Sequence, residues 1–510
     1  MAMIRTSLAF DKDNCFNQED NRRTLIRSSV YTVLVFVVFL SFWNQPVFSS
    51  DEPEIFVKGQ QIARGELLYQ MVDSQHMPLM YHFAALLAKA GVSGIAGFRT
   101  GFYALYAVFF GCIFYRGSDL LGTKALAAFL VSYVSLISTI SYGTAVLCEH
   151  FQGLGMTMLF LELILYMKNR RFGVKSYIFC GIAAFISFGG AFVSIFGLFA
   201  FFTGIIALNT KWSGAEKFDL CRCTFDVLKI AVSMFVPLSM YFMYFVATGT
   251  VKELFQWAYR FNVEVYSKYL DKGYGGSVLG ALFGGISNIA GTFKFDTISS
   301  AVLMHVVVIA VCLLFVVEKW EENRIYAVVL VFFTITCATR AVFDFHGIPV
   351  LALFSFIIGY EFDLHYNRLK SLICRNRLRR VCAIVLMALM CSGFLTQAKA
   401  VFYYSTDEVY NTASTGYALR VLGDDYEEIG FFHTNHELLM QGRMSRGILR
   451  LPPTVKIQRI IFSISIMIPA RACCLLRHAL FCFINHVCWT GVGCGGARSA
   501  GPHSLFLRLD

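Results

Sequence analysis

The side chains best suited to chemistry gather in one stretch, residues 51–82. This stretch opens with the acidic pair Asp51-Glu52 and continues with residues that exchange protons or bind anions, namely Arg64, Glu66, Tyr69, Asp73 and His76. A carboxylate can take the proton of an attacking hydroxyl, a second can hold a metal ion, and Arg or His can bind a phosphate. The alternative is a solvated loop whose charges only mark the surface of a membrane.

Two further polar groups are expected on the same side as this stretch. Glu149-His150 stands where an apolar run begins, and the segment from Arg340 to His346 separates two such runs. Glu149 is therefore a candidate second acid, and His150, Arg340 and His346 are candidates for binding substrate. Taken singly, His76, Arg340 and His346 are equally well explained as anchors at a membrane surface, and Glu149 as a structural acid.

The composition indicates which elements must position these residues. Of 510 residues, 57% are hydrophobic and 15% are charged, whereas a soluble domain has about 45–50% apolar and about 25% charged residues. Such a chain needs the bilayer as solvent, so it is an all-α polytopic membrane protein. The net charge of +11 comes from short basic clusters between apolar runs, a pattern typical of cytoplasmic loops and not of a nucleic-acid surface. Most of the 16 Cys lie in apolar runs, where Cys packs as a small hydrophobe.

The apolar runs predict about eleven transmembrane helices, with the N-terminus in the cytoplasm. The expected spans are 29–48, 99–116, 124–142, 151–167, two short or broken spans within 176–208, 226–247, 298–317, 325–339, 347–361 and 381–397. The clusters at 168–175, 209–229 and 368–380 mark the inner side. Residues 78–90 are apolar but too short to span, which predicts an interfacial helix in the first outer loop.

The expected organisation has four parts. Residues 1–28 form a cytoplasmic segment, residues 29–398 a transmembrane domain, and residues 399–450 a small extracytoplasmic segment. The outer loops of the transmembrane domain are 49–98, 141–152, 248–297 and 340–346. Residues 451–510 are rich in Cys and nearly free of acids, which favours a non-native reading frame or a disordered tail over a Cys-rich extracytoplasmic appendage. Deleting this tail should leave membrane insertion and activity intact.

The motifs together resemble a family of membrane enzymes. The residues that carry the resemblance are Asp51-Glu52, Ile62-Ala63-Arg64-Gly65-Glu66-Leu67-Leu68-Tyr69, His76-Met77-Pro78-Leu79, Arg99, Glu149, Gly189-Gly190, and Arg340 with His346-Gly347-Ile348-Pro349. They are similar to the motifs of the GT-C glycosyltransferases, in particular the bacterial protein O-mannosyltransferase-like group and the lipid A aminoarabinose transferases. The resemblance covers roughly residues 25–430. Met77-Pro78 stands where Pro-Pro is usual, and Glu149 stands where Asp is common.

The resemblance implies a glycosyltransferase of the cell membrane with an extracytoplasmic active site. Its donor would be a polyprenyl-phosphate sugar, and its acceptor a hydroxyl of a glycan, a lipid or a protein. Asp51 would be the general base, Glu52 and Glu149 would assist or hold a divalent metal ion, and Arg64 and His76 would bind the leaving phosphate. Tyr69, His150, Arg340 and His346 complete the expected substrate site. No nucleotide-binding glycine loop is present in the sequence, which agrees with a lipid-linked donor.

Two other classes stay open on the sequence alone. A transporter or flippase of a lipid-linked saccharide would need ionisable residues deep inside its spans, and Glu162 is the main candidate for such a residue. An O-antigen polymerase or ligase would carry its large outer loop late in the chain, whereas the charged loop here follows the first span.

Overall fold

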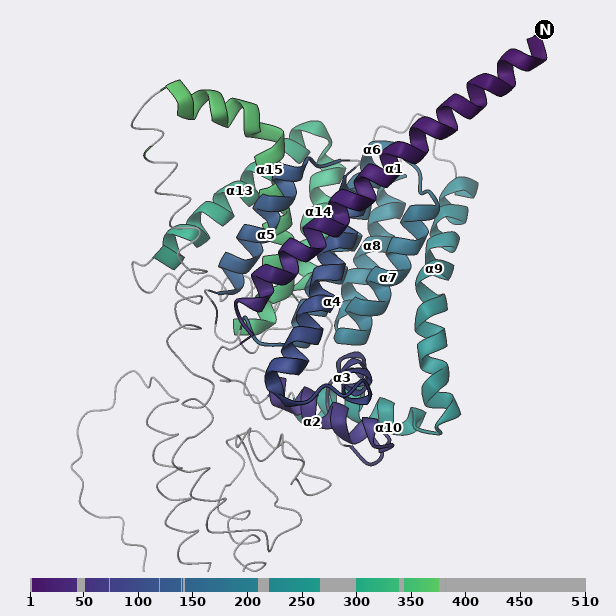
Figure 1. Ribbon diagram of the computed structural model, residues 1–510, viewed down its shortest axis with the longest axis vertical. Helices are drawn as coiled ribbons and strands as arrows, with labels where there is room; N and C mark the ends of the chain where they lie inside the picture. The colour runs from purple at the N-terminus through teal and green to yellow at the C-terminus, as the bar shows by residue number, and fades with distance from the viewer. Residues whose placement is uncertain are drawn as a thin grey trace, which may run out of the picture. The chain divides into compact units, whose positions relative to one another are not determined.

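The computed structural model describes residues 2–43, 51–72, 74–118, 120–138, 140, 143–209, 220–266, 300–338, 344–375 and 381. These residues are mostly helical (84%), and none of them lies in a strand (Figure 1). The chain divides into two units, Met1–Val409 with Gly430–Arg450, and Tyr410–Ile429 with Leu451–Asp510. All of the helices described below belong to the first unit, and the Cys-rich tail lies outside the described residues.

A series of apolar helices makes up most of this unit. They are α1 (Ala2–Leu40), α4 (Gly94–Gly117), α5 (Thr123–Ile137), α6 (Cys148–Asn169), α7 (Val174–Gly190), α8 (Ser194–Leu208), α9 (Leu220–Ala247), α13 (Ser300–Glu322), α14 (Arg324–Cys337) and α15 (Ile348–Arg375). Five helical segments among the described residues are long and apolar enough to cross a membrane: Asn21–Leu40, Gly94–Gly117, Cys148–Asn169, Cys223–Ala247 and Phe345–Ser371. The described residues are those of an all-α protein with several helices able to cross a membrane, and the eleven expected spans stay a prediction. The expected span 381–397 lies outside the described residues, except for residue 381.

The long apolar stretch at 176–208 is divided into two helices, as its length predicts. Helix α7 ends at Gly190, Ala191 is extended (φ −148°, ψ 125°), and α8 begins at Ser194. A Cβ added at Gly190 would lie 3.0 Å from the Phe151 Cβ and 3.1 Å from the Cys148 carbonyl oxygen. The glycine therefore lets the end of α7 pack closely against the start of α6.

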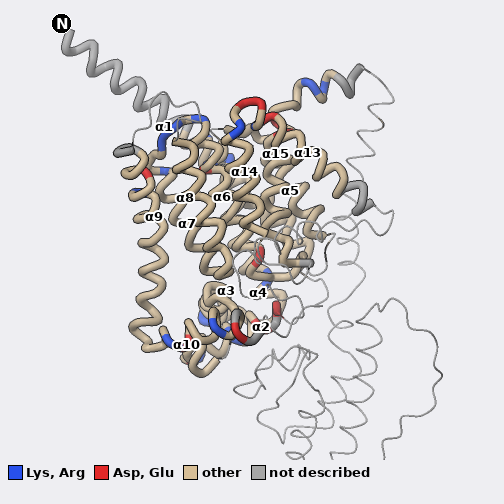
Figure 2. The backbone as a smooth tube through the Cα atoms, turned by 180° about the vertical axis from the view of Figure 1, so that it is seen from behind, with Lys and Arg blue, Asp and Glu red and all other residues tan. Residues whose placement is uncertain are grey.

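Helix α6 forms the centre of the unit, because every residue from Cys148 to Met167 is buried. It packs against α4, α7, α8, α14 and α15. The outer helices α1 and α9 instead expose large apolar side chains, for example Val232, Phe235 and Met240 on α9. Charged residues gather toward the two ends of the helices and leave a broad uncharged middle (Figure 2). An exposed apolar belt of this kind suits lipid contact.

Short helices cover one end of the long ones. They are α2 (Asp51–Ala63), α3 (Leu79–Lys89), and α10 (Val251–Phe255), which continues as the π-helix η2 (Gln256–Tyr266). Helix α3 confirms the helix expected at 78–90, whereas α2 was not predicted as a helix. Three acids in its first turn, Asp51, Glu52 and Glu54, favour its start, because negative charge stabilises a helix N-terminus. Helix α2 packs along α3.

Candidate functional site

A buried ion pair fixes the first turn of α2. Glu52 is fully buried, and Arg99 on α4 donates from Nε to Glu52 Oε1 (2.8 Å) and from Nη2 to Oε2 (2.6 Å). The Val146 backbone N–H donates to Oε1 as well (3.1 Å), and Arg99 Nη1 donates to the Trp43 carbonyl oxygen (3.1 Å). Two parallel charge-assisted bonds set distance and orientation together. Glu52 therefore ties α2 to α4, to the residues after α1, and to the turn before α6.

The same turn leads into the second predicted acid. Helix α6 begins at Cys148, and Glu149 in its first turn is 1% exposed. The Cys148 thiol donates to Glu149 Oε2 (3.3 Å), and His346 Nε2 lies 3.7 Å from Oε1. His346 comes from the short helix η3 (Asp344–Gly347). The structure thus brings together Glu149 and His346, which are far apart in the chain.

His150 is held by hydrogen bonds at both of its ring nitrogens. Its Nε2 lies 3.1 Å from the Ala145 carbonyl oxygen, which only accepts hydrogen bonds, so Nε2 carries the proton. Its Nδ1 is hydrogen-bonded to the Tyr133 hydroxyl (2.6 Å). His150 is 1% exposed, and its ring packs against Tyr106 at 5.0 Å between centroids. These contacts are those of a residue that shapes the start of α6.

Asp51 precedes this buried group by one residue. Adjacent residues on a helix point about 100° apart, so the Asp51 carboxylate leaves α2 in a different direction from that of Glu52. Asp51 is half-buried, whereas Glu52 is fully buried. The ion pair that holds Glu52 therefore also fixes the backbone that carries Asp51.

The predicted residues Arg64, Tyr69 and His76 lie in the segment that connects α2 to α3. Arg64 is exposed and follows the end of α2, about 20 Å from Asp51 along the helix at about 1.5 Å per residue. Tyr69 is buried with φ +70°, and its hydroxyl donates to the His76 carbonyl oxygen (2.6 Å). The structure does not place Arg64 beside Asp51. Arg340, the remaining predicted residue, lies outside the described residues.

Sequence reasoning missed His82 on α3, which faces α9. His82 Nδ1 is hydrogen-bonded to the Tyr241 hydroxyl (2.7 Å), and its ring stacks on Phe245 (5.8 Å between centroids). Phe245 also packs against Tyr69 (6.1 Å), so His82 and Tyr69 share one aromatic cluster. Burial lowers the pKa of His82 to about 4. Only the aromatic run at 241–245 could have indicated this cluster from the sequence.

The expected divalent metal ion does not fit Glu52. Arg99 and Val146 already occupy both of its oxygens, and the guanidinium neutralises its charge. A metal ion there would be repelled by Arg99. The contacts therefore favour a positioning role for Glu52 over a metal-binding one.

Comparison with known protein families, with curated proteins and with solved structures gives no match. The family resemblance of the motifs at 51–79 therefore stays an expectation. The case for a function rests on two sets of contacts, Glu52 with Arg99 and Glu149 with His346, and on Asp51, which directly precedes Glu52.

Proposed function

We propose that this protein is a membrane glycosyltransferase that moves a sugar from a polyprenyl-phosphate carrier to a hydroxyl acceptor of a glycan, lipid or protein. Asp51 is the general base, and the active site lies on the extracytoplasmic face. The observation that carries the proposal is the Glu52–Arg99 ion pair, which fixes the turn bearing Asp51 at one end of an apolar helical body. Proton abstraction by a side chain requires such fixed placement.

The reaction is a substitution at the anomeric carbon. Asp51 takes the proton of the acceptor hydroxyl, whose oxygen attacks that carbon while the bond to the phosphate oxygen breaks. The products are the glycosylated acceptor and polyprenyl phosphate. We assign the leaving phosphate to His346, together with Arg340 in the same segment, because Arg64 lies about 20 Å along α2 from Asp51 and Arg99 is held by Glu52.

The proposal includes eleven spans with a cytoplasmic N-terminus. The ten apolar helices from α1 to α15 fall on the first ten expected spans, and 381–397 would be the eleventh. Four of the ten, α5, α7, α8 and α14, have 17 residues or fewer. Short helices of this kind are accommodated where neighbouring helices cover their ends.

The contacts of Glu162 argue against the transporter alternative. Glu162 Oε1 accepts from Arg116 Nε (2.5 Å), and Arg116 Nη2 donates to the Ser176 hydroxyl (2.9 Å). Glu162 and Arg116 are both buried, so the charge is neutralised within the helix packing. A transport site needs an ionisable group that meets the transported solute. This acid instead joins α4 to α6 and, through Arg116, to α7.

The test is donor consumption by the purified full-length protein in proteoliposomes, with a panel of radiolabelled polyprenyl-phosphate sugars. Asp51→Asn should lower turnover by about 10²–10⁴ while the unfolding temperature stays that of the wild type. Glu54→Gln is the matched control, since Glu54 is on the same turn and bonds to Lys58 and Tyr81. Full turnover by Asp51→Asn would overturn the assignment of the base. Movement of an intact lipid-linked saccharide between leaflets, without consumption, would establish the transporter instead.

A further inference from the structure

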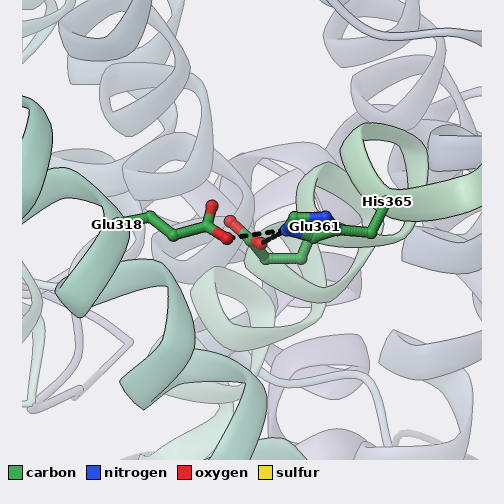
Figure 3. A group of neighbouring side chains, drawn as sticks. All are labelled: Glu318, Glu361 and His365. Atoms are coloured by element: carbon green, nitrogen blue, oxygen red, sulfur yellow. Dashed lines mark hydrogen bonds and ion pairs between the residues drawn. The ribbon is translucent and has the colours of Figure 1, made fainter. Parts of the chain in front are cut away.

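A second polar cluster lies far from the site that contains Asp51. It consists of Glu318 on α13 and of Glu361 and His365 on α15 (Figure 3). Glu361 comes 13 residues after the first residue of α15, hence about 20 Å along the helix from η3 and His346. The cluster is therefore independent of the proposed active site.

The three side chains converge on one point. His365 Nε2 lies 2.7 Å from Glu318 Oε1 and 3.4 Å from Glu361 Oε2, and one ligand atom from each residue lies within 4.8 Å of the others. Glu361 and His365 are four residues apart, so they share one face of α15. Glu318 reaches them from α13, which packs against α15.

Glu361 is buried without a hydrogen bond to either carboxylate oxygen, and its one ion-pair contact in the described residues is His365 Nε2 at 3.4 Å. Its side chain is 4% exposed. A buried carboxylate that lacks hydrogen bonds is costly, the facing Glu318 carboxylate adds repulsion, and the hydrogen bond of His365 Nε2 goes to Glu318 Oε1 (2.7 Å). The nearby Lys319 ammonium is directed to Glu322 Oε2 (2.7 Å) and to the Tyr360 hydroxyl (3.3 Å).

We propose that Glu318, Glu361 and His365 bind a divalent transition-metal ion of the Zn²⁺ or Mn²⁺ class. Carboxylate oxygens and an imidazole nitrogen suit these ions. With bonds of about 2.1 Å, ligand atoms at the corners of a tetrahedron lie about 3.4 Å apart, which is the separation of His365 Nε2 and Glu361 Oε2. On binding, His365 Nε2 loses its proton and coordinates the ion. Glu318 then coordinates the ion in place of its hydrogen bond to His365.

The site is accessible and joins two helices. The side chains of Glu318 and His365 are 27% and 26% exposed, so an ion reaches Glu361 past them. The bound ion cross-links α13 to α15, and a water completes its coordination. Its role is to hold these helix ends together, separately from any reaction at Asp51.

The experiment uses the full-length protein in detergent, stripped with a chelator and dialysed separately against Zn²⁺ and Mn²⁺. Bound Zn²⁺ is measured by mass spectrometry and bound Mn²⁺ by electron paramagnetic resonance, because thiols of the 16 Cys bind Mn²⁺ poorly. Glu361→Gln and His365→Gln should each bind one equivalent of metal ion fewer than the wild type. Neither variant should show the rise in unfolding temperature that the metal ion gives the wild type. Glu322→Gln is the matched control, a 52% exposed carboxylate at the end of the same α13.

Two results would overturn the proposal. One is a wild type that binds no more Mn²⁺ than Glu361→Gln. The other is equal stabilisation of the wild type and His365→Gln by Zn²⁺. Because His365 is partly exposed, His365→Gln tests the site even where Glu361→Gln disturbs folding. Neither readout depends on glycosyl transfer, so a failure here leaves the proposed function untouched.

Discussion

Asp51 and Glu52 are adjacent acids with different surroundings, which the sequence did not show. Both were candidate catalytic residues because both follow an apolar run. The difference arises from Arg99, which follows Glu52 by 47 positions in the chain and forms its ion pair with Glu52. Such a pairing depends on how α2 and α4 pack, and no local pattern in the sequence encodes it.

Breaking this pair should destabilise the protein. Glu52→Gln leaves the Arg99 guanidinium buried without its counter-charge, at a cost of about 3–5 kcal/mol. The double variant Glu52→Gln with Arg99→Met should recover much of that loss, because it removes the isolated charge. Thermal unfolding followed by size-exclusion chromatography measures both variants. A Glu52→Gln variant with wild-type stability would show that the ion pair does not anchor α2.

His82 should give the protein a pH-dependent stability. Its folded pKa of about 4 lies below the ordinary value of about 6.5. Between these values the unfolded chain binds a proton that the folded chain does not, so stability rises with pH across this window, by up to about 3 kcal/mol. His82→Gln should lack this part of the slope. The measurement is the unfolding temperature of the wild type and of His82→Gln from pH 5 to pH 7. The same pH dependence in both proteins would contradict the burial of a neutral His82.

At the scale of elements, apolar runs predicted most of the helices. Ten runs coincide with the helices α1 to α15, and the break at Gly189-Gly190 was placed correctly. Helix α2 was missed because its acids and Lys58 interrupt the spacing of apolar residues that indicates an amphipathic helix. Its stability comes from packing on α3 and from the buried Glu52, both of which are tertiary effects. Residue type made Asp51, Glu149 and His346 candidates, and their roles stay predictions; the separation of Arg64 from Asp51 required the structure.

The close packing of α5 against α15 depends on Gly359. A Cβ there would collide with the Ala125 carbonyl oxygen and lie 3.1 Å from the Phe129 Cβ. Backbone atoms cannot move aside cheaply, so Gly359→Ala should cost about 1–3 kcal/mol. Gly117→Ala is the control, since its nearest contact would be Leu121 Cδ1 at an ordinary 3.5 Å. Equal unfolding temperatures for the two variants would mean that α15 can shift away from α5.

At the scale of the whole molecule, the orientation in the membrane decides where Asp51 works. An impermeant thiol reagent added to intact cells should label Arg64→Cys but not Lys370→Cys, each placed in a background without accessible native Cys. Both positions are exposed, so the difference reports the side of the membrane. The reverse labelling pattern would put the acids of α2 in the cytoplasm and end the proposed mechanism.

The Arg116–Glu162 pair also bears on how the protein is made. Arg116 leaves the ribosome 46 residues before Glu162, an interval of about 2–9 s at about 5–20 residues per second. Arg116 directly precedes Gly117, the last residue of α4. A long cationic side chain at a helix end can place its charge in the headgroup region. Glu162 lies seven residues before the end of α6, within its apolar length, where an unpaired charge is costly. Arg116 is therefore synthesised before Glu162. When α6 is inserted as proposed, Arg116 is already present to neutralise the charge of Glu162.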